Sequence, residues 1–267
     1  MQKFYTKPKI ARECSTLVKK YIDIDRKNDL IIEPSAGNGA FIPSLKKLCK
    51  NTIFIDIKPD NPKITKQDYL TWSPSSASDI SKYRKIHVIG NPPFGFKGSM
   101  AIKFFKKSAR YADTIAFILP LSFAKKSMQH SIPLHFHLTY SWILPANSFK
   151  FHNEDVDIPS IFQIWMRKEF LRKEPPKISP SGYKYVKDFQ QADVAIRRVG
   201  SNAGKIYTSD LHTRNHNSHY FIKIDNPSHI ILLRNKKVIK NKAKAYVTGP
   251  LSISKKDMTK ELNHTLS

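Results

Sequence analysis

The stretch that decides the fold is residues 30–41, which read LIIEPSAGNGAF. Three consecutive aliphatic residues that end at an acidic one are typical of a strand buried on both faces. Gly37 and Gly39 then mark a turn, because glycine adopts backbone conformations that a Cβ disfavours. A helical pattern begins at Phe41. A strand that turns through glycines into a helix starts a βαβ unit, so the sequence predicts a parallel sheet.

Strands and helices alternate in the same way along the first two thirds of the chain. The sequence therefore predicts an α/β fold, a Rossmann-like sheet with helices on both faces. A late antiparallel pair of strands, joined by the acidic loop 154–157, is expected to finish the sheet. Helices are expected at 8–22, 41–48 and 99–111, and strands at 30–32, 52–57, 64–70, 85–89, 114–119, 141–144 and 161–166.

Polar side chains stand where four of these strands end. They are Glu33, Asp56, Asp68 and Asn91. The carboxyl ends of parallel strands meet at one edge of a sheet, where α/β proteins bind their ligands. We therefore expect the four side chains to lie close together at a binding site.

Asn91, Pro92, Pro93 and Phe94 follow the apolar stretch 86–90 directly. Proline fixes φ and has no N–H, so the Pro92 carbonyl can point outward as an acceptor. The Asn91 amide oxygen is a second acceptor, and Phe94 offers a flat ring. Together they suit a planar ring that bears an exocyclic amine. The alternative is a plain turn, since Pro-Pro and Phe-Gly are common in loops.

Composition limits the class of protein. The chain has 267 residues and a formal net charge of +25. The sequence contains no run of about 18 apolar residues, the length that spans a membrane. Its first residues lack the apolar region of a signal peptide. Cys14 and Cys49 are too few for a disulfide framework or a metal knuckle. We expect an intracellular protein of the cytoplasm or nucleus, with no membrane partner.

The positive charge is denser toward the C-terminus. Lys and Arg number 25 against 13 Asp and Glu in residues 1–166, and 21 against 8 in residues 167–267. Such charge favours nucleic acid as the partner, although a general lysine bias would produce it too. A charged, proline-rich run at 172–177 predicts two domains, 1–170 and 171–267. Strand-like runs are expected at 193–200, 220–224 and 229–233, and a polar tail from about residue 255.

Residues 4–166 resemble the S-adenosylmethionine-dependent N6-adenine methyltransferases of the gamma motif order, of the Asn-Pro-Pro-Phe type. The resemblance rests on five pieces: the N-terminal Thr-Pro element around Thr6, the glycine loop 33–39, the acidic end of the strand 52–57, an Asp-aromatic-Leu run at 68–70, and the tetrapeptide 91–94. It implies a class I methyltransferase sheet and S-adenosyl-L-methionine as cofactor. The implied cofactor-binding residues are Thr6, Glu33, Ser35, Gly37, Gly39, Asp56, Ile57, Asp68, Tyr69 and Asn91.

The same resemblance implies the chemistry. Asn91, Pro92, Pro93 and Phe94 would be the catalytic residues that hold the adenine amine and its ring, with the base turned out of any duplex. Candidate nucleic-acid contacts are Phe94 and Lys97, together with Arg197 and Arg198 in the C-terminal region. The motif order favours DNA slightly over RNA. No metal is expected. The histidines at 130, 135 and 137 have no cysteine or carboxylate at ligand spacing, and those at 212, 216 and 219 are expected to belong to a polar loop.

Two other functions stay open at this point. Protein glutamine N5-methyltransferases also use Asn-Pro-Pro-aromatic, although the net charge of +25 argues against a protein substrate. A catalytically inactive methyltransferase fold that only binds nucleic acid is the third possibility. The target sequence, strandedness and oligomeric state are not predicted by the sequence.

Overall fold

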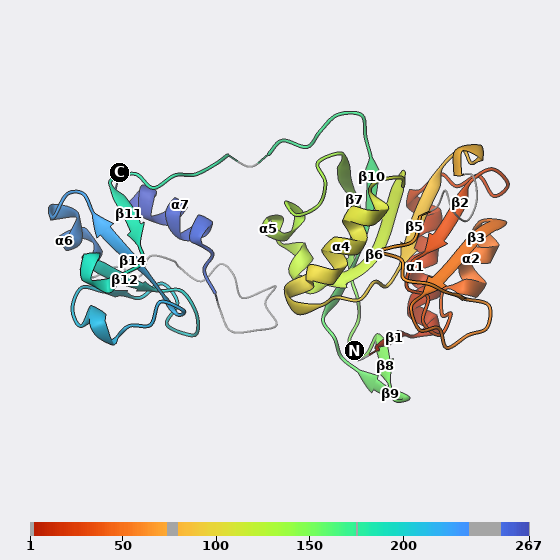
Figure 1. Cartoon of the computed structure of the whole chain (residues 1–267), viewed down its shortest axis with the longest axis horizontal. Helices are drawn as coiled ribbons and strands as arrows, with labels where there is room; N and C mark the ends of the chain where they lie inside the picture. Colours follow the sequence, from red (N-terminus) through yellow and green to blue (C-terminus); the bar gives the residue numbers. More distant parts are fainter. Residues whose placement is uncertain (1–2, 74–79, 175, 235–251, 267) are drawn as a thin grey trace. The chain divides into compact units, whose positions relative to one another are not determined.

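The computed structural model describes residues 3–73, 80–174, 176–234 and 252–266 (Figure 1). The chain divides into two compact units, Met1–Glu174 and Pro175–Ser267. The division lies four residues beyond the end of the predicted catalytic domain at 170, within the charged run 172–177. Each unit is described by itself.

The first unit is built on a seven-stranded sheet with the order β4-β3-β2-β5-β6-β10-β7. From β2 the chain runs outward to β3 and β4, then returns to the other side of β2 for β5 and β6. The pairs from β4 to β6 are parallel, whereas β10 is antiparallel to both of its neighbours. The direction of winding therefore switches between β2 and β5. The strands are β2 (Leu30–Glu33), β3 (Asn51–Asp56), β4 (Thr65–Lys66), β5 (Ile86–Gly90), β6 (Thr114–Pro120), β7 (Phe136–Ile143) and β10 (Ser160–Arg167).

Helices cover both faces of this sheet. Successive side chains of a strand point to opposite faces, so Ile31 packs in one core cluster and Ile32 in the other. The first cluster includes residues of α1 (Pro8–Tyr21) and α2 (Ile42–Leu48), and the second includes residues of α4 (Ser99–Ser108). The expected α/β fold, a Rossmann-like sheet with helices on both faces, is confirmed.

The acidic segment 154–157 differs from the expected loop. Most of it forms β9 (Glu154–Val156), which pairs with β8 (Phe149–Phe151), and β8 in turn pairs with β1 (Tyr5–Thr6). His152 and Asn153, with φ of 47° and 67°, make the two-residue turn between β8 and β9. Positive φ at both turn residues matches the right-handed twist of a hairpin. The expected strand 64–70 is also shorter, because residues 68–72 turn back on themselves.

The second unit is a four-stranded antiparallel sheet with the order β11-β14-β12-β13. Helices α6 and α7 contribute Leu233, Met258 and Leu262 to its core. Its elements are β11 (Tyr183–Val186), β12 (Val194–Arg197), β13 (Ile206–Tyr207), β14 (His219–Ile224), α6 (Ser228–Arg234) and α7 (Lys255–Leu266).

Two expectations for this unit were wrong. Residues 229–233 form helix α6 rather than a strand, since the Asn226 side chain accepts from the Ser228 N–H and Pro227 stands at the start, both typical of a helix N-terminus. The supposed polar tail is α7, which begins at a serine N-cap: the Asp257 N–H donates to Ser254 Oγ, and Ser254 Oγ in turn donates to Asp257 Oδ2.

Short helical segments complete the two units. They are η1 (Ile80–Lys82), η2 (Phe96–Gly98), η3 (Leu121–Ala124), α5 (Lys126–Gln129), η4 (Phe189–Gln191) and η5 (Leu211–Thr213). Within the described ranges, no helix combines the length and apolar character that crossing a bilayer requires.

Candidate active site

The ends of β2 and β5 meet at the switch point of the sheet. A Cβ built on Gly90 would stand 3.1 Å from Glu33 Cγ, so the two strand ends are in contact. Ser35 Oγ donates a hydrogen bond of 2.8 Å to the backbone carbonyl of Asn91. The glycine loop after β2 is thereby joined to the tetrapeptide after β5. Ligands of open α/β sheets bind at such a crevice.

The Asn91 side chain is held by one end of its amide. Its Nδ2 donates to Thr6 Oγ1 at 3.1 Å, and Thr6 is only 6% exposed. Its Oδ1 is buried and has no hydrogen-bond partner among the described residues. An unpaired buried acceptor costs roughly 1–3 kcal/mol. Asn91 therefore presents a fixed acceptor oxygen that a ligand N–H can satisfy.

The other residues of the tetrapeptide differ in their backbone hydrogen bonds. Pro92 is buried, and within the described ranges no hydrogen bond to its carbonyl occurs. The Phe94 carbonyl accepts from the N–H groups of Met100 and Ala101 at 3.1 and 3.3 Å, which joins the tetrapeptide to the start of α4. The Phe94 ring is half-buried against the first core cluster, beside Pro93, which is also half-buried.

A tight loop just beyond the tetrapeptide presents an aromatic side chain that the sequence reasoning missed. Phe96 is 80% exposed, and Lys97 Nζ lies 5.0 Å from the centre of its ring. Gly95, Lys97 and Gly98 all have positive φ, at 68°, 51° and 77°. A Cβ on Gly95 would come within 2.9 Å of the Met100 backbone nitrogen, so only glycine fits there. The signal in the sequence is the run Phe-Gly-Phe-Lys-Gly, in which two glycines enclose an aromatic and a cation.

The glycine turn 36–39 is organised by Asp56, at the end of β3. The Gly37 N–H donates to Asp56 Oδ2 and the Lys58 N–H to Oδ1, both at 2.8 Å. Gly37 has a φ of 53°, and the Tyr5 ring would lie 3.2 Å from a Cβ placed on it. The turn therefore needs glycine at 37 because of the protein's own contacts.

Gly39 has the same kind of constraint. Its φ is 87°, and an added Cβ would come within 2.7 Å of Asn61 Nδ2 and 2.8 Å of Ile42 Cδ1.

Ile57, directly after Asp56, is 64% exposed although it is aliphatic. An exposed apolar side chain beside a carboxylate suits a ligand with a flat ring and adjoining hydroxyls.

Two buried carboxyl groups face this edge. Glu33 is 2% exposed and Asp56 is 7% exposed. Burial, and then the charge of Asp56, raises the pKa of Glu33 well above its usual value. Glu33 Oε2 also has no hydrogen-bond partner within the described chain. Glu33 is thus a second polar group whose hydrogen bonding the protein leaves incomplete.

Asp68 lies close to the end of β3, since the Gln67 N–H before it donates to the Asp56 carbonyl at 2.9 Å, whereas the Tyr69 side chain lies elsewhere. Asp68 Oδ1 accepts from the Leu70 N–H at 2.9 Å, which caps the turn after β4. Tyr69 is 2% exposed, stacks on Phe104 at 5.3 Å, and shares a 2.7 Å hydrogen bond with Ser108. The Tyr69 side chain is therefore part of the core between the sheet and α4.

The remaining candidates lie in the second unit. Arg197 ends β12 and donates from Nε to the Val199 carbonyl at 3.0 Å. The Arg198 guanidinium lies 5.5 Å from the Tyr220 ring, which packs on the core beneath the helices. Strand alternation places Arg197 toward the opposite face. A search of the described residues finds no cluster of three or more His, Cys, Asp or Glu arranged to hold a metal ion.

Comparison with known proteins gives similarities at the level of folds. No protein family and no curated protein matches the sequence. Solved structures do match. The 23S rRNA methyltransferase ErmE shares 15% identity over 65% of this chain and 73% of its own, with a TM-score of 0.45. A putative RNA methyltransferase from Pyrococcus horikoshii shares 16% identity over 59% of this chain and 83% of its own, also at 0.45. A putative class I S-adenosylmethionine-dependent methyltransferase from Listeria monocytogenes shares 15% identity over 65% and 64%, at 0.47.

Proposed function

We propose that this protein is an S-adenosylmethionine-dependent methyltransferase that acts on the N6 amine of adenine in nucleic acid. The observation that carries the proposal is Asn91 Oδ1, a buried acceptor without a partner in the described chain, at the switch point of a Rossmann-like sheet. The Pro92 carbonyl is the second acceptor in the proposal. An exocyclic NH₂ has two protons, one for each oxygen.

The role of the two acceptors follows from the chemistry of the amine. The N6 lone pair is delocalised into the adenine ring, so the amine is a weak nucleophile. Hydrogen bonds from its two protons to fixed oxygens favour a tetrahedral nitrogen, and they stabilise the positive charge that develops on it. Because Thr6 and Ser35 hold Asn91 at both its amide and its carbonyl, the oxygens need little reorganisation.

We place the cofactor on the side of the site that Glu33, Asp56 and Ile57 form. S-adenosylmethionine supplies a methyl group on a positively charged sulfur. In the proposal Asp56 accepts from ribose hydroxyls with its remaining lone pairs, and the exposed Ile57 packs on the cofactor's adenine. Glu33 offers Oε2 to a polar hydrogen of the cofactor. We assign Thr6 to the orientation of Asn91 and leave the Tyr69 side chain out of the site, because it lies in the core.

The net charge supports a polyanionic substrate. A charge of +25 attracts nucleic acid through the release of its counterions. A protein glutamine, whose amide also has two protons, would fit the two acceptors but gains nothing from this charge. Adenine in DNA or RNA is therefore the substrate that we propose.

The test is transfer of a labelled methyl group to adenine-containing oligonucleotides, separately as DNA and RNA, followed by digestion to nucleosides. We expect label in N6-methyladenine. Asn91→Ala should reduce transfer at least 100-fold and leave cofactor affinity nearly unchanged, whereas Asn202→Ala, an exposed asparagine of the second unit, should not alter either. Label in a glutamine of a protein substrate, or cofactor binding without transfer to any acceptor, would contradict the proposal.

A further inference from the structure

The sheet of the second unit has one face covered by helices. Alternate side chains of its strands, including Tyr183, Ile196 and Ile222, pack with α6 and α7 in one core cluster. The residues between them point to the opposite face. Residues of η4 and η5 lie over this face around Phe221.

Aromatic and cationic side chains occupy this second face. The pairing places Phe221 beside Ala195 and Val186, and Tyr207 beside Ala195. The two rings therefore belong to one row across the sheet, separated by the small side chain of Ala195. Lys184 and Lys223 are exposed on neighbouring positions of β11 and β14.

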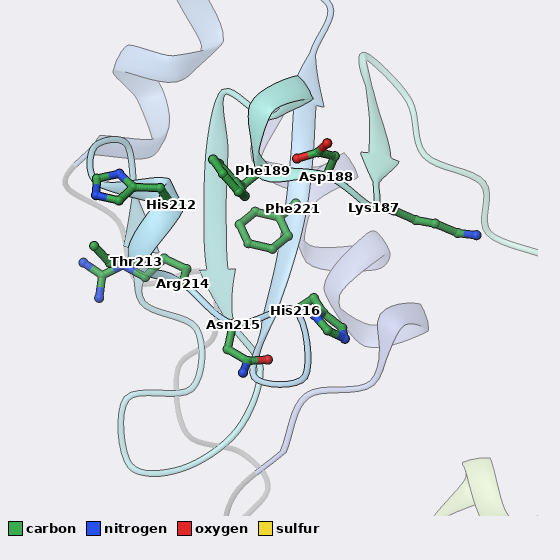
Figure 2. Close-up of a pocket in the computed structure, with 9 residues that line it drawn as sticks. All are labelled: Lys187, Asp188, Phe189, His212, Thr213, Arg214, Asn215, His216 and Phe221. Carbon is green, nitrogen blue, oxygen red and sulfur yellow. The ribbon is translucent and has the colours of Figure 1, made fainter.

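A pocket of about 610 Å³ opens beside Phe221. Figure 2 shows the Phe221 ring at its centre with the Phe189 ring next to it, and polar side chains of residues 212–216 around them. Phe221 is 4% exposed, whereas Phe189 is 37% exposed. A ligand can therefore contact the Phe189 ring, whereas the buried Phe221 ring forms the base of the pocket.

The pocket is lined by two cationic side chains and one carboxylate. The Arg214 guanidinium stacks 4.0 Å from the Tyr207 ring, and its Nε is buried without a hydrogen-bond partner in the described chain. Lys187, His212 and His216 also line the pocket. Its carboxylate, Asp188, accepts from the Gln190 N–H at 2.9 Å and caps η4.

We infer that this pocket binds a nucleotide of single-stranded nucleic acid. The base stacks on Phe189, and Arg214 contacts a flanking phosphate. Aromatic side chains on a sheet, with cations along the strand's path, are how proteins hold unpaired bases. A duplex keeps its bases stacked on each other and cannot present one to Phe189. The inference rests on the proposed nucleic-acid substrate, but it does not depend on catalysis.

The experiment measures binding of the full chain to a fluorescent adenine-containing 12-nucleotide single strand, as RNA and as DNA, without cofactor. Phe189→Ala removes the ring on which one base stacks and should weaken binding by about tenfold. Arg214→Ala should weaken it by a similar factor. Lys256→Ala removes one exposed positive charge from α7, on the helical side of the same unit, and should change binding less than about twofold.

Two further measurements separate stacking from other effects. Phe189→Trp keeps a flat ring and should retain the affinity of the unaltered protein. An excess of inorganic phosphate should not displace the strand to the extent that adenosine monophosphate does. Equal weakening by Phe189→Ala and Lys256→Ala, or equal displacement by phosphate and the nucleotide, would overturn the inference.

The outcome is independent of methyl transfer. Asn91→Ala protein should still bind the strand through this pocket. Phe189→Ala protein that no longer binds the strand but still methylates free adenosine would support both proposals. The loss of binding would support the pocket, and the continued transfer would support the active site. If no transfer is found with any acceptor but the pocket variants still lose affinity, only the proposed function fails.

Discussion

At the scale of single residues, the central feature is that the nitrogen and the oxygen of the Asn91 amide have different roles. Asn91 donates with Nδ2 to Thr6 and keeps Oδ1 for a ligand. Without the Thr6 hydroxyl, rotation of the amide by 180° would put an N–H donor where the acceptor stands. That N–H would oppose the N–H of an incoming amine. Thr6 is therefore a positioning residue.

This arrangement predicts the effect of Thr6→Val, which keeps the shape of the side chain and removes the acceptor. We expect kcat for methyl transfer to fall by about tenfold, because one hydrogen bond of about 1.4 kcal/mol no longer selects the active amide orientation. Thr6→Ser, which keeps the hydroxyl, should restore most of the rate. Steady-state kinetics would check this. A change in the KM for cofactor with no change in kcat would mean that Thr6 only supports the cofactor.

At the scale of elements, the loop 95–98 has a more definite shape than its exposure suggests. Two glycines and Lys97 in left-handed conformations hold Phe96 in solvent. An exposed ring next to the Asn-Pro-Pro-Phe tetrapeptide can stack on a base adjacent to the target. Phe94 is less available for this because its ring is packed against the core.

We therefore expect Phe96→Ala to raise the KM for an oligonucleotide by about tenfold, with kcat largely unchanged, since a stacked base contributes about 1–3 kcal/mol. Phe170→Ala is the matched control, because Phe170 is another phenylalanine that is 63% exposed. Kinetics with an oligonucleotide and with free adenosine would be compared. An equal effect of Phe96→Ala on both substrates would contradict a contact with the neighbouring base.

Elements with a strong internal pattern could be predicted from the sequence. Residues 30–32 and 115–119 are continuous apolar runs, and α1 has a clear helical spacing, so their type and order followed from the sequence pattern. Residues 230–233 are aliphatic at every position, and such a short run does not separate strand from helix. Only the preceding Asn-Pro signals the helix.

The candidate site could be predicted only in part. Strand ends identified Glu33, Asp56 and Asn91, because parallel strands bring their carboxyl ends together whatever their distance in the chain. The contact between Thr6 and Asn91 depends on tertiary packing of β1 against β8. The core position of Tyr69 follows from its contacts with α4, which the local sequence does not specify. The aromatic pocket of the second unit depends on how its short strands align with one another, and the sequence of such short strands does not determine that register.

At the scale of the whole molecule, the base of the seven-stranded sheet contains a buried ionic cluster. Asp29 is fully buried and accepts from Arg84 Nε and Nη2, each at 2.8 Å, and lies 3.1 Å from His87 Nε2. Burial would raise the pKa of Asp29, but the hydrogen bonds from Arg84 and His87 outweigh it and lower the pKa to about 2. The cluster connects the starts of β2 and β5.

The lowered pKa predicts how stability depends on pH. An unfolded aspartate has a pKa of about 3.9, so the contribution of Asp29 is complete above that value and is lost as the pH falls from about 4 to about 2. Asp29→Asn should therefore lower the free energy of unfolding at pH 7 by about 2–3 kcal/mol, and the difference from the unaltered protein should shrink as the pH falls. Thermal unfolding from pH 7 to pH 3 measures this.

Asp157→Asn, an exposed carboxylate, is the control and should change stability by less than about 0.5 kcal/mol. If Asp29→Asn and Asp157→Asn behave alike at pH 7, the ionic cluster does not stabilise the fold.

The pairing of β1 with β8 has a consequence for the order of assembly. Thr6 and Phe149 are partners across 143 positions of the chain, so the strand that carries Thr6 cannot dock until the hairpin of β8 and β9 has been synthesised. During translation, β2, β3 and β5 can pair well before that. A nascent chain would thus have β2 to β6 available for pairing while the Asn91 amide still lacks its Thr6 partner, whereas β10, through which β7 joins the sheet, follows the hairpin in the chain. We therefore expect the proposed methyl transfer only late in synthesis.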